Sequence, residues 1–367
     1  MKIGIITIHK INNFGSALQA YALQYFLKKS GYDNQIIDYH WTWENYNPNL
    51  FQRLISFMKM WAKLILTPNT SYSRFCRFYL NYFDLTKKEY TKHNINNCPP
   101  QYDLYITGSD QVWNCRFTEG DTNFLLQFAP DSAKRISYAS SFASPKLPEK
   151  YSKIFAKQLA KYEHITVREY SGVDIVKVLT GKEAKVVCDP TLLLTSEDYS
   201  SIANCSKITI VDKYILVYLL DYMFDPYPYV NKLIENVGQV FENYKMVYLR
   251  CSQQCKRFGN YINVEEAGPL EFLYLMQHAS FVITTSFHGT AFAAIFKIPL
   301  LAIVQDKRND GRIQTLLKEL HQSDSVIDYN ELPSNDLIKS SAIVTREIHL
   351  NKLRNDSIEI LIDMIKK

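Results

Sequence analysis

The sequence contains no uninterrupted apolar run long enough for a transmembrane helix. Such a helix needs about 20 mostly apolar residues, and no run of that kind occurs among the 367 residues. The first residues, MKIGIITIHKINNF, also lack the basic start, unbroken apolar segment and small-residue cleavage site of a signal peptide. We therefore expect a cytoplasmic protein.

Cysteine is sparse and scattered. The seven cysteines are odd in number, and only Cys251 and Cys255 stand close together. A disulfide framework needs pairs, and a structural zinc site needs a second ligand pair at a fixed spacing, which this sequence lacks. We predict no disulfide framework and no metal.

Acidic residues are absent between Asn45 and Phe83, a segment that carries five basic ones. Its stretch FQRLISFMKMWAKLIL gathers apolar side chains on one helical face, namely Phe51, Leu54, Ile55, Met58, Trp61 and Ile65. Basic side chains lie toward the other face, at Arg53, Lys59 and Lys63. This pattern predicts peripheral contact with an anionic membrane, and the alternative is a surface helix that packs its apolar face on the domain. We expect no binding of nucleic acid.

Short apolar runs alternate with helical patterns along the rest of the chain. KIGIITI reads as a buried strand, and the helix after it has Asn13 as its N-cap and Gly31 at its end. QIIDY follows as a second strand, so this β-α-β unit predicts a parallel sheet. Further strands are predicted in DLYITGSD, RISYASSF, HITVREYSG, KVVCDPTLLL, YILVYLL, KMVYLRC, SFVITTSF, LLAIVQ and SVIDY.

The length and the alternating pattern predict two α/β domains. We place a Rossmann-like doubly wound domain at 1–195, with an aromatic and basic insertion at 41–95, and a second such domain at 196–345. A final helix at 346–367 is expected to cross back to the first domain. Ligands of such folds bind beyond the carboxyl ends of the strands, so we expect the two domains to face a cleft.

The strand in DLYITGSD is followed by polar residues. Ser109 and Asp110 stand where the strand ends, and Trp113 offers a flat face for stacking on a sugar. The alternative for Asp110 is that it caps the next helix. Arg168 follows the strand HITV, where its guanidinium could grip a phosphate, the alternative being a surface ion pair with Glu169 or Asp174. Asp189, before a proline, reads mainly as a turn residue.

The stretch TTSFHGTAFAAIF joins an apolar strand to an apolar helix. Ser286, His288, Gly289 and Thr290 lie at the junction, where the helix amino terminus offers N–H groups and a partial positive charge to an anion. His288 is thus a candidate for proton transfer, the alternative being a histidine satisfied inside the fold. Downstream, Lys307, Arg308 and Arg312 predict a cationic rim.

These motifs, in their order and spacing from about Ile5 to Leu320, resemble the polysaccharide pyruvyl transferase family. The residues that carry the resemblance are NNFGSALQAYAL, TGSDQVWN, ISYASSF, VREYSGVDI, CDPTLLL, TTSFHGTAFAAIF and GRIQTLLKEL. The resemblance implies a fold similar to GT-B glycosyltransferases and transfer of the enolpyruvyl carbons of phosphoenolpyruvate to a hexose. The product would be a pyruvate ketal on a capsular or exopolysaccharide glycan, formed without a cofactor.

The resemblance also implies roles for single residues. It assigns catalysis to His288 and Asp110, with the acceptor at the first domain and phosphoenolpyruvate at the second, and it matches Arg168 to a family arginine. Many members carry an arginine two residues before the histidine, where this chain has Ser286. The missing charge would then come from Arg168, Arg308, Arg312 or the helix amino terminus.

Two other functions fit the same architecture. A nucleotide-sugar glycosyltransferase would need a nucleotide pocket in the second domain, where no Gly-rich loop or acidic ribose clamp stands out. A non-catalytic protein that binds a glycan or a lipid carrier is kept open by the missing arginine at position 286.

Overall fold

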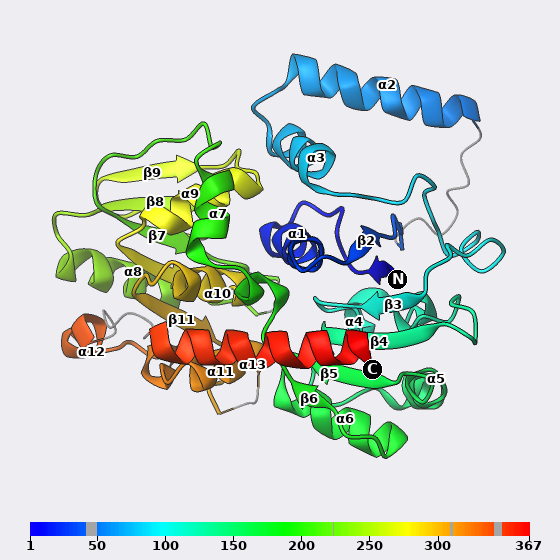
Figure 1. Ribbon diagram of the computed structural model, residues 1–367. Helices are drawn as coiled ribbons and strands as arrows, with labels where there is room; N and C mark the ends of the chain where they lie inside the picture. The colour runs from blue at the N-terminus through cyan, green and yellow to red at the C-terminus, as the bar shows by residue number, and fades with distance from the viewer. Residues whose placement is uncertain (42–49, 223, 309–310, 341–346) are drawn as a thin grey trace. The chain divides into compact units, whose positions relative to one another are not determined.

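The computed structural model describes residues 1–41, 50–222, 224–308, 311–340 and 347–367 (Figure 1). The chain forms two compact units, Met1–Leu193 with Asn355–Lys367, and Leu194–Arg354. Each unit contains one six-stranded sheet in which all paired strands are parallel. The predicted α/β class is therefore confirmed.

The sheet of the first unit has the strand order β2-β1-β3-β4-β5-β6. Its strands are β1 (Lys2–Ile6), β2 (Asp33–Ile36), β3 (Leu104–Thr107), β4 (Lys134–Ser140), β5 (His164–Val167) and β6 (Lys185–Val186). The central strand β3 is buried along its whole length, as expected for a parallel sheet covered on both faces. We call the edge where the strands end the carboxyl edge.

The helices of the first unit begin with α1 (Phe14–Lys29), whose predicted ends are confirmed. The Asn13 side chain accepts a hydrogen bond from the Ser16 backbone N–H at 3.1 Å, and Gly31 just beyond the helix has a φ of +85°. The other helices are α4 (Cys115–Thr118), α5 (Glu149–Leu159), α6 (Tyr170–Thr180), the short η1 (Thr122–Leu125) and η2 (Pro190–Leu193), and the second half of α13 (Glu347–Lys366).

The insertion predicted at 41–95 contains two helices, α2 (Leu50–Leu66) and α3 (Ser71–Tyr82), while residues 42–49 lie outside the described residues. Buried rings of α3 cover α1, and Phe75 stacks on Phe14 with ring centroids 5.5 Å apart. Helix α2 packs against α3 and lies farther from α1 than α3 does (Figure 1).

The sheet of the second unit has the order β12-β11-β10-β7-β8-β9. Its strands are β7 (Tyr214–Tyr218), β8 (Lys245–Leu249), β9 (Tyr261–Val264), β10 (Phe281–Thr284), β11 (Leu300–Val304) and β12 (Val326–Asp328). Its helices are α7 (Ser196–Ala203), α8 (Tyr229–Val240), α9 (Pro269–His278), α10 (Phe287–Ile295), α11 (Arg312–Glu319), η3 (Ser323–Ser325) and α12 (Asn335–Ser340), followed by the first half of α13. Among the described helices of the chain, none is long and apolar enough to cross a bilayer.

Two strands differ from the predictions. The edge strand β9 was not predicted, because two of its four residues are exposed and it forms no apolar run. The strand predicted in KVVCDPTLLL is β6, which is only two residues long, and the turn predicted at Asp189 is confirmed. The chain turns after it because Pro190 cannot continue the ladder and Asp189 accepts a hydrogen bond from the Thr191 N–H at 3.0 Å.

Candidate functional site

Polar side chains meet inside the first unit at the carboxyl edge. Ser109 and Asp110 follow β3, Arg168 follows β5, Asp189 follows β6, and Ser16 lies in the first turn of α1. All five are at most 4% exposed. We call this group the Asp110 cluster.

The Asp110 cluster is held together by ion pairs and hydrogen bonds. Arg168 donates from Nη1 to Oδ2 of Asp189 at 2.6 Å, and its Nη2 lies 3.8 Å from Oδ1 of Asp110. Ser16 donates to Oδ2 of Asp110 at 2.5 Å, and Ser109 donates to Oδ2 of Asp189 at 2.9 Å. One guanidinium thus pairs with two buried carboxylates, an arrangement that fixes their positions and leaves the group with more negative than positive charge.

Backbone geometry directs Asp110 into this cluster. Gly108 has a φ of +107°, and a Cβ there would lie 2.4 Å from the Tyr138 carbonyl oxygen, so only glycine fits. Asp110 itself has a φ of +67°, which aspartate tolerates better than most residues. Helix α4 begins only at Cys115 and is capped by Asn114. The alternative prediction, that Asp110 caps the next helix, is therefore wrong.

The alternative of a surface ion pair between Arg168 and Glu169 or Asp174 is wrong, because Arg168 is 3% exposed and pairs with the aspartates of the cluster. That its guanidinium binds a phosphate or carboxylate of a ligand stays a prediction. We infer that it positions Asp110 and Asp189, because its charge is engaged within the fold.

Three residues in or next to this cluster make contacts that the sequence did not predict. Asp189 was predicted mainly as a turn residue and Ser16 had no predicted role, although both lie in motifs that carry the family resemblance, CDPTLLL and NNFGSALQAYAL. Glu169, predicted only as an alternative surface partner of Arg168, is 1% exposed. Its Oε1 accepts hydrogen bonds from the Phe142 N–H at 2.8 Å and the Ala143 N–H at 3.1 Å, which fix the loop after β4.

Trp113 does not offer the predicted stacking face. It is fully buried in the core of the first unit, and its indole Nε1 donates to the Phe124 carbonyl oxygen at 3.1 Å. A buried tryptophan needs such an acceptor for its N–H. The residue therefore supports the loop after β3 from inside.

The second unit places the other predicted residues at the amino terminus of α10. Ser286 is the N-cap, and its side chain accepts a hydrogen bond from the Gly289 N–H at 3.2 Å. The Thr290 hydroxyl donates back to the Ser286 carbonyl oxygen at 3.0 Å. A Cβ at Gly289 would lie 2.4 Å from Oγ1 of Thr284, so glycine allows α10 to approach β10 closely. The Ser286 cap satisfies one of the N–H groups that a helix start leaves unpaired, the Gly289 N–H.

His288 lies in the first turn of α10 and is 7% exposed. Its ring contacts Phe287 edge to face, with ring centroids 5.1 Å apart. The position places an imidazole, which carries ring nitrogens that can donate or accept hydrogen bonds, at the partial positive charge of a helix amino terminus.

Of the predicted cationic rim, one member comes close to this helix start. The Arg312 guanidinium, at the start of α11, lies 5.8 Å from the centroid of Phe287. Arg308 is 85% exposed along its side chain and turns to Asp306, with Nε 3.0 Å from Oδ1. That hydrogen bond raises the pKa of Arg308. Lys307 pairs with Glu331 at 2.7 Å. Arg312 therefore lies against the first turn of α10, and its role in place of the arginine missing at position 286 stays a prediction.

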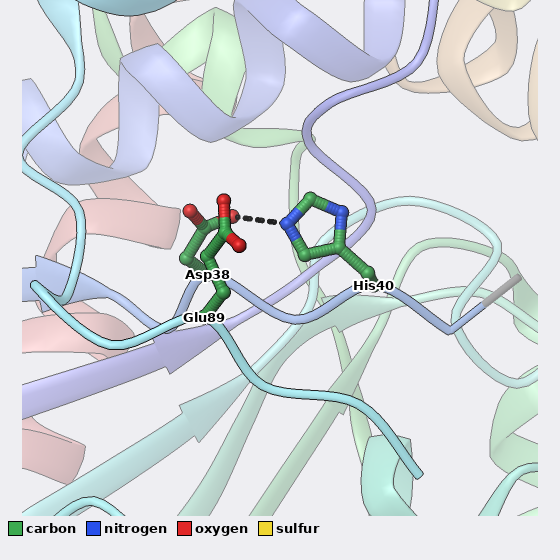
Figure 2. A group of neighbouring side chains, drawn as sticks. All are labelled: Asp38, His40 and Glu89. Atoms are coloured by element: carbon green, nitrogen blue, oxygen red, sulfur yellow. Dashed lines mark ion pairs between the residues drawn. The ribbon is translucent and has the colours of Figure 1, made fainter. Parts of the chain in front are cut away.

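A second polar cluster lies where β1 and β2 end in the first unit. Asp38, His40 and Glu89 each have a ligand atom within 4.8 Å of the others, and Figure 2 shows the ion pair between Asp38 and His40. Among the described residues, these three side chains form the one group that could hold a metal ion. Asp38 is already occupied, however, because Lys10 donates to its Oδ2 at 2.6 Å and His9 lies 3.1 Å from its Oδ1.

The partners of Asp38 keep it ionised. Burial raises the pKa of this carboxyl, but hydrogen bonds from His40 and His9 and the charge of Lys10 outweigh burial and hold the pKa well below its ordinary value. A metal ion would have to compete with the Lys10 ammonium. The absence of a metal remains a prediction.

A family model for polysaccharide pyruvyl transferases matches residues 13–307, which include Ser16, Asp110, Arg168, Asp189 and His288. The chain belongs to the polysaccharide pyruvyl transferase family. Arg308 and Arg312 lie just beyond the matched segment. No curated protein sequence matches the chain.

The fold of this pyruvyl transferase family member is similar to those of sugar-nucleotide enzymes. The UDP-GlcNAc 2-epimerase of Methanocaldococcus jannaschii, solved with UDP-GlcNAc and UDP, is 14% identical with a TM-score of 0.54, and the similarity covers 100% of this chain and 99% of that one. The MnaA–UDP structure from S. aureus is 11% identical with a TM-score of 0.55, covering 100% and 98%. The Neisseria meningitidis UDP-GlcNAc 2-epimerase is 9% identical with a TM-score of 0.52 and covers 100% of each chain. At these identities the similarity shows the GT-B-like fold alone.

Proposed function

We propose that this transferase moves the enolpyruvyl carbons of phosphoenolpyruvate onto a hexose of a lipid-linked or polymeric glycan. The product is a pyruvate ketal, formed during capsule or exopolysaccharide biosynthesis. The observation that carries the proposal is the family match over residues 13–307, which includes His288 at the amino terminus of α10.

The reaction needs one proton at carbon and one leaving phosphate. A proton adds to the methylene carbon of phosphoenolpyruvate, and a sugar hydroxyl attacks the cationic carbon that results. A second hydroxyl then replaces the phosphate, which leaves with its bridging oxygen. Of the two hydroxyl protons, one balances the new methyl group and the other leaves with the phosphate. No electrons are gained or lost, so the chemistry requires no redox cofactor.

We assign these steps to residues of both units. His288 delivers the proton or binds the phosphate, with Ser286, Gly289 and Thr290 building the helix start around it. Arg312 supplies the positive charge that a trianionic substrate requires. Asp110, held by Ser16 and Arg168, acts on an acceptor hydroxyl as a base or an orienting group. The buried partners support an orienting group in particular, because they hold Asp110 in one place.

Because the acceptor is lipid-linked in this proposal, we place the enzyme at the inner face of the cell membrane. The support is the cationic, aromatic-rich segment between Asn45 and Phe83, which has no acidic residue.

Phosphate release from phosphoenolpyruvate tests the proposed reaction. The protein is supplied with candidate lipid-linked acceptors, and UDP-sugars replace phosphoenolpyruvate in a parallel reaction. We expect phosphate release that depends on the acceptor. Sugar transfer from a UDP-sugar would instead make the protein a nucleotide-sugar glycosyltransferase. Acceptor binding with neither reaction would make it a glycan- or carrier-binding protein.

A further inference from the structure

Helix α2 exposes the apolar face that the sequence predicted. Its outward side chains include Phe51 (69% exposed), Leu54 (53%), Met58 (55%), Trp61 (44%) and Ile65 (72%). Leu54, Met58, Trp61 and Ile65 follow one another at helical spacing, so they form a continuous stripe. The alternative, in which this face packs on the domain, is wrong.

Contacts with α3 fix which side of α2 faces outward. Leu64 is the side chain of α2 that is buried, at 5% exposed, among those described. Arg77 of α3 donates to the Leu64 carbonyl oxygen at 2.8 Å and to the Pro68 carbonyl oxygen at 2.7 Å, and Ser73 donates to the Lys63 carbonyl oxygen at 3.3 Å. These bonds satisfy carbonyl groups at the end of α2. The helix is therefore anchored at its carboxyl end with the stripe turned away from α3.

The charge of this part of the chain indicates what covers the stripe. Lys59 and Lys63 are exposed on the opposite side of α2, and neither α2 nor α3 contains an acidic residue. A soluble partner protein or a second copy of this chain would also bury the stripe, but a second copy would bring together two regions that carry positive charge and no acidic residue. An anionic bilayer can bind both the apolar stripe and the positive charge. Apolar side chains enter the acyl region, while lysines remain at the level of the lipid phosphates.

We propose that α2 is a membrane-docking helix that lies in the interface of an anionic phospholipid bilayer. The apolar stripe enters the bilayer, Trp61 lies at the depth of the headgroups, and Lys59 and Lys63 contact lipid phosphates. The role of this docking, which is to bring the enzyme to a lipid-linked acceptor, rests on the proposed function. Its physical basis is independent of the reaction.

Vesicle co-sedimentation of the full chain tests the proposal directly. We expect binding to vesicles that contain phosphatidylglycerol, much weaker binding to pure phosphatidylcholine, and release by salt. The Trp61 emission should shift to the blue on binding, since this side chain is partly exposed in water. Absence of binding to anionic vesicles at low salt would overturn the proposal.

Matched variants separate the contribution of the apolar stripe to membrane binding from that of the lysines. Replacing Leu54, Met58 and Ile65 together by serine should weaken binding more than about tenfold, whereas replacing the exposed Val178 and Val211 by serine should not change it. Lys59→Gln with Lys63→Gln should weaken binding about fivefold per lysine, and Lys153→Gln with Lys207→Gln serves as the charge control. Equal effects of the test and control variants would contradict a role for α2.

Two further readouts distinguish this proposal from others. With a water-soluble acceptor, the serine variant should retain wild-type phosphate release, and with a lipid-linked acceptor in vesicles it should lose most of it. If the protein binds vesicles but uses no phosphoenolpyruvate, the proposed function fails and the docking helix stands. A third outcome would overturn the docking proposal: the wild-type protein is a dimer, the serine substitutions dissociate it, and the protein does not bind vesicles. The stripe would then be an interface between two copies of the chain.

Discussion

The two units build their carboxyl edges in opposite ways. The first unit buries charged side chains that pair with one another, with Arg168 between Asp110 and Asp189. The second unit presents the backbone of a helix start, capped by Ser286, with Arg312 nearby. The first arrangement holds a carboxylate in place, and the second offers positive potential to an anion. The difference supports an acceptor role for the first unit and a phosphoenolpyruvate role for the second.

Removing the charge that holds the first edge together should have the largest effect. Arg168→Met leaves two buried carboxylates without their common partner, so the free energy of unfolding should fall by about 3–5 kcal/mol. Urea denaturation measures it. Arg308→Met, at an exposed site, should change it by less than about 0.5 kcal/mol. Similar values for both variants would show that the Asp110 cluster does not hold the edge.

Removing the proposed proton donor of the second edge, His288, should affect the reaction rather than the fold. His288→Asn should lower kcat by about 10²- to 10⁴-fold, the typical contribution of a general acid. Phosphate release measures the rate, and circular dichroism confirms that the variant is folded. Turnover like that of the wild type in a folded variant would refute the role of His288.

Variants of Arg312 and Arg308 test which arginine of the second unit binds phosphoenolpyruvate. Arg312→Ala should raise the KM for phosphoenolpyruvate by about tenfold or more, because a charge-assisted contact contributes about 1.5–3 kcal/mol. Arg308→Ala should leave KM unchanged, since Arg308 turns to Asp306. Steady-state kinetics at saturating acceptor measures both. If Arg308→Ala raises KM and Arg312→Ala does not, the assignment is reversed.

The smallest expected effect concerns acid stability in the first unit. The folded-state pKa of Asp38 is lowered, so its contribution to stability is present above the ordinary carboxyl pKa and is lost as the pH falls through the folded value. Asp38→Asn should remove this dependence and flatten the loss of stability below about pH 4. Denaturation at a series of pH values measures it, and an unchanged acid slope would contradict the pairing.

The strands and the first helix were predictable because their signals are local. β3 and β10 are unbroken apolar runs, and Asn13 and Gly31 mark the ends of α1 within a few residues. The edge strand β9 has no such signal, because two of its four residues are exposed to solvent and they alternate with less exposed ones.

The contacts of the site were less predictable because they join distant segments. Ser16 meets Asp110, and Arg168 meets Asp189, only once the parallel strands place their ends side by side. Local sequence located the polar residues at strand ends but could not tell an exposed guanidinium from a buried one. Trp113 was misjudged for the same reason, since burial depends on what packs around it.

The most direct test of the account follows the carbons of phosphoenolpyruvate into the product. With phosphoenolpyruvate labelled with ¹³C at the methylene carbon, NMR of the glycan should show a labelled ketal methyl group and one phosphate released per ketal. Phosphate release without a labelled methyl group, or a glycan that gains a sugar and no pyruvate, would contradict pyruvyl transfer.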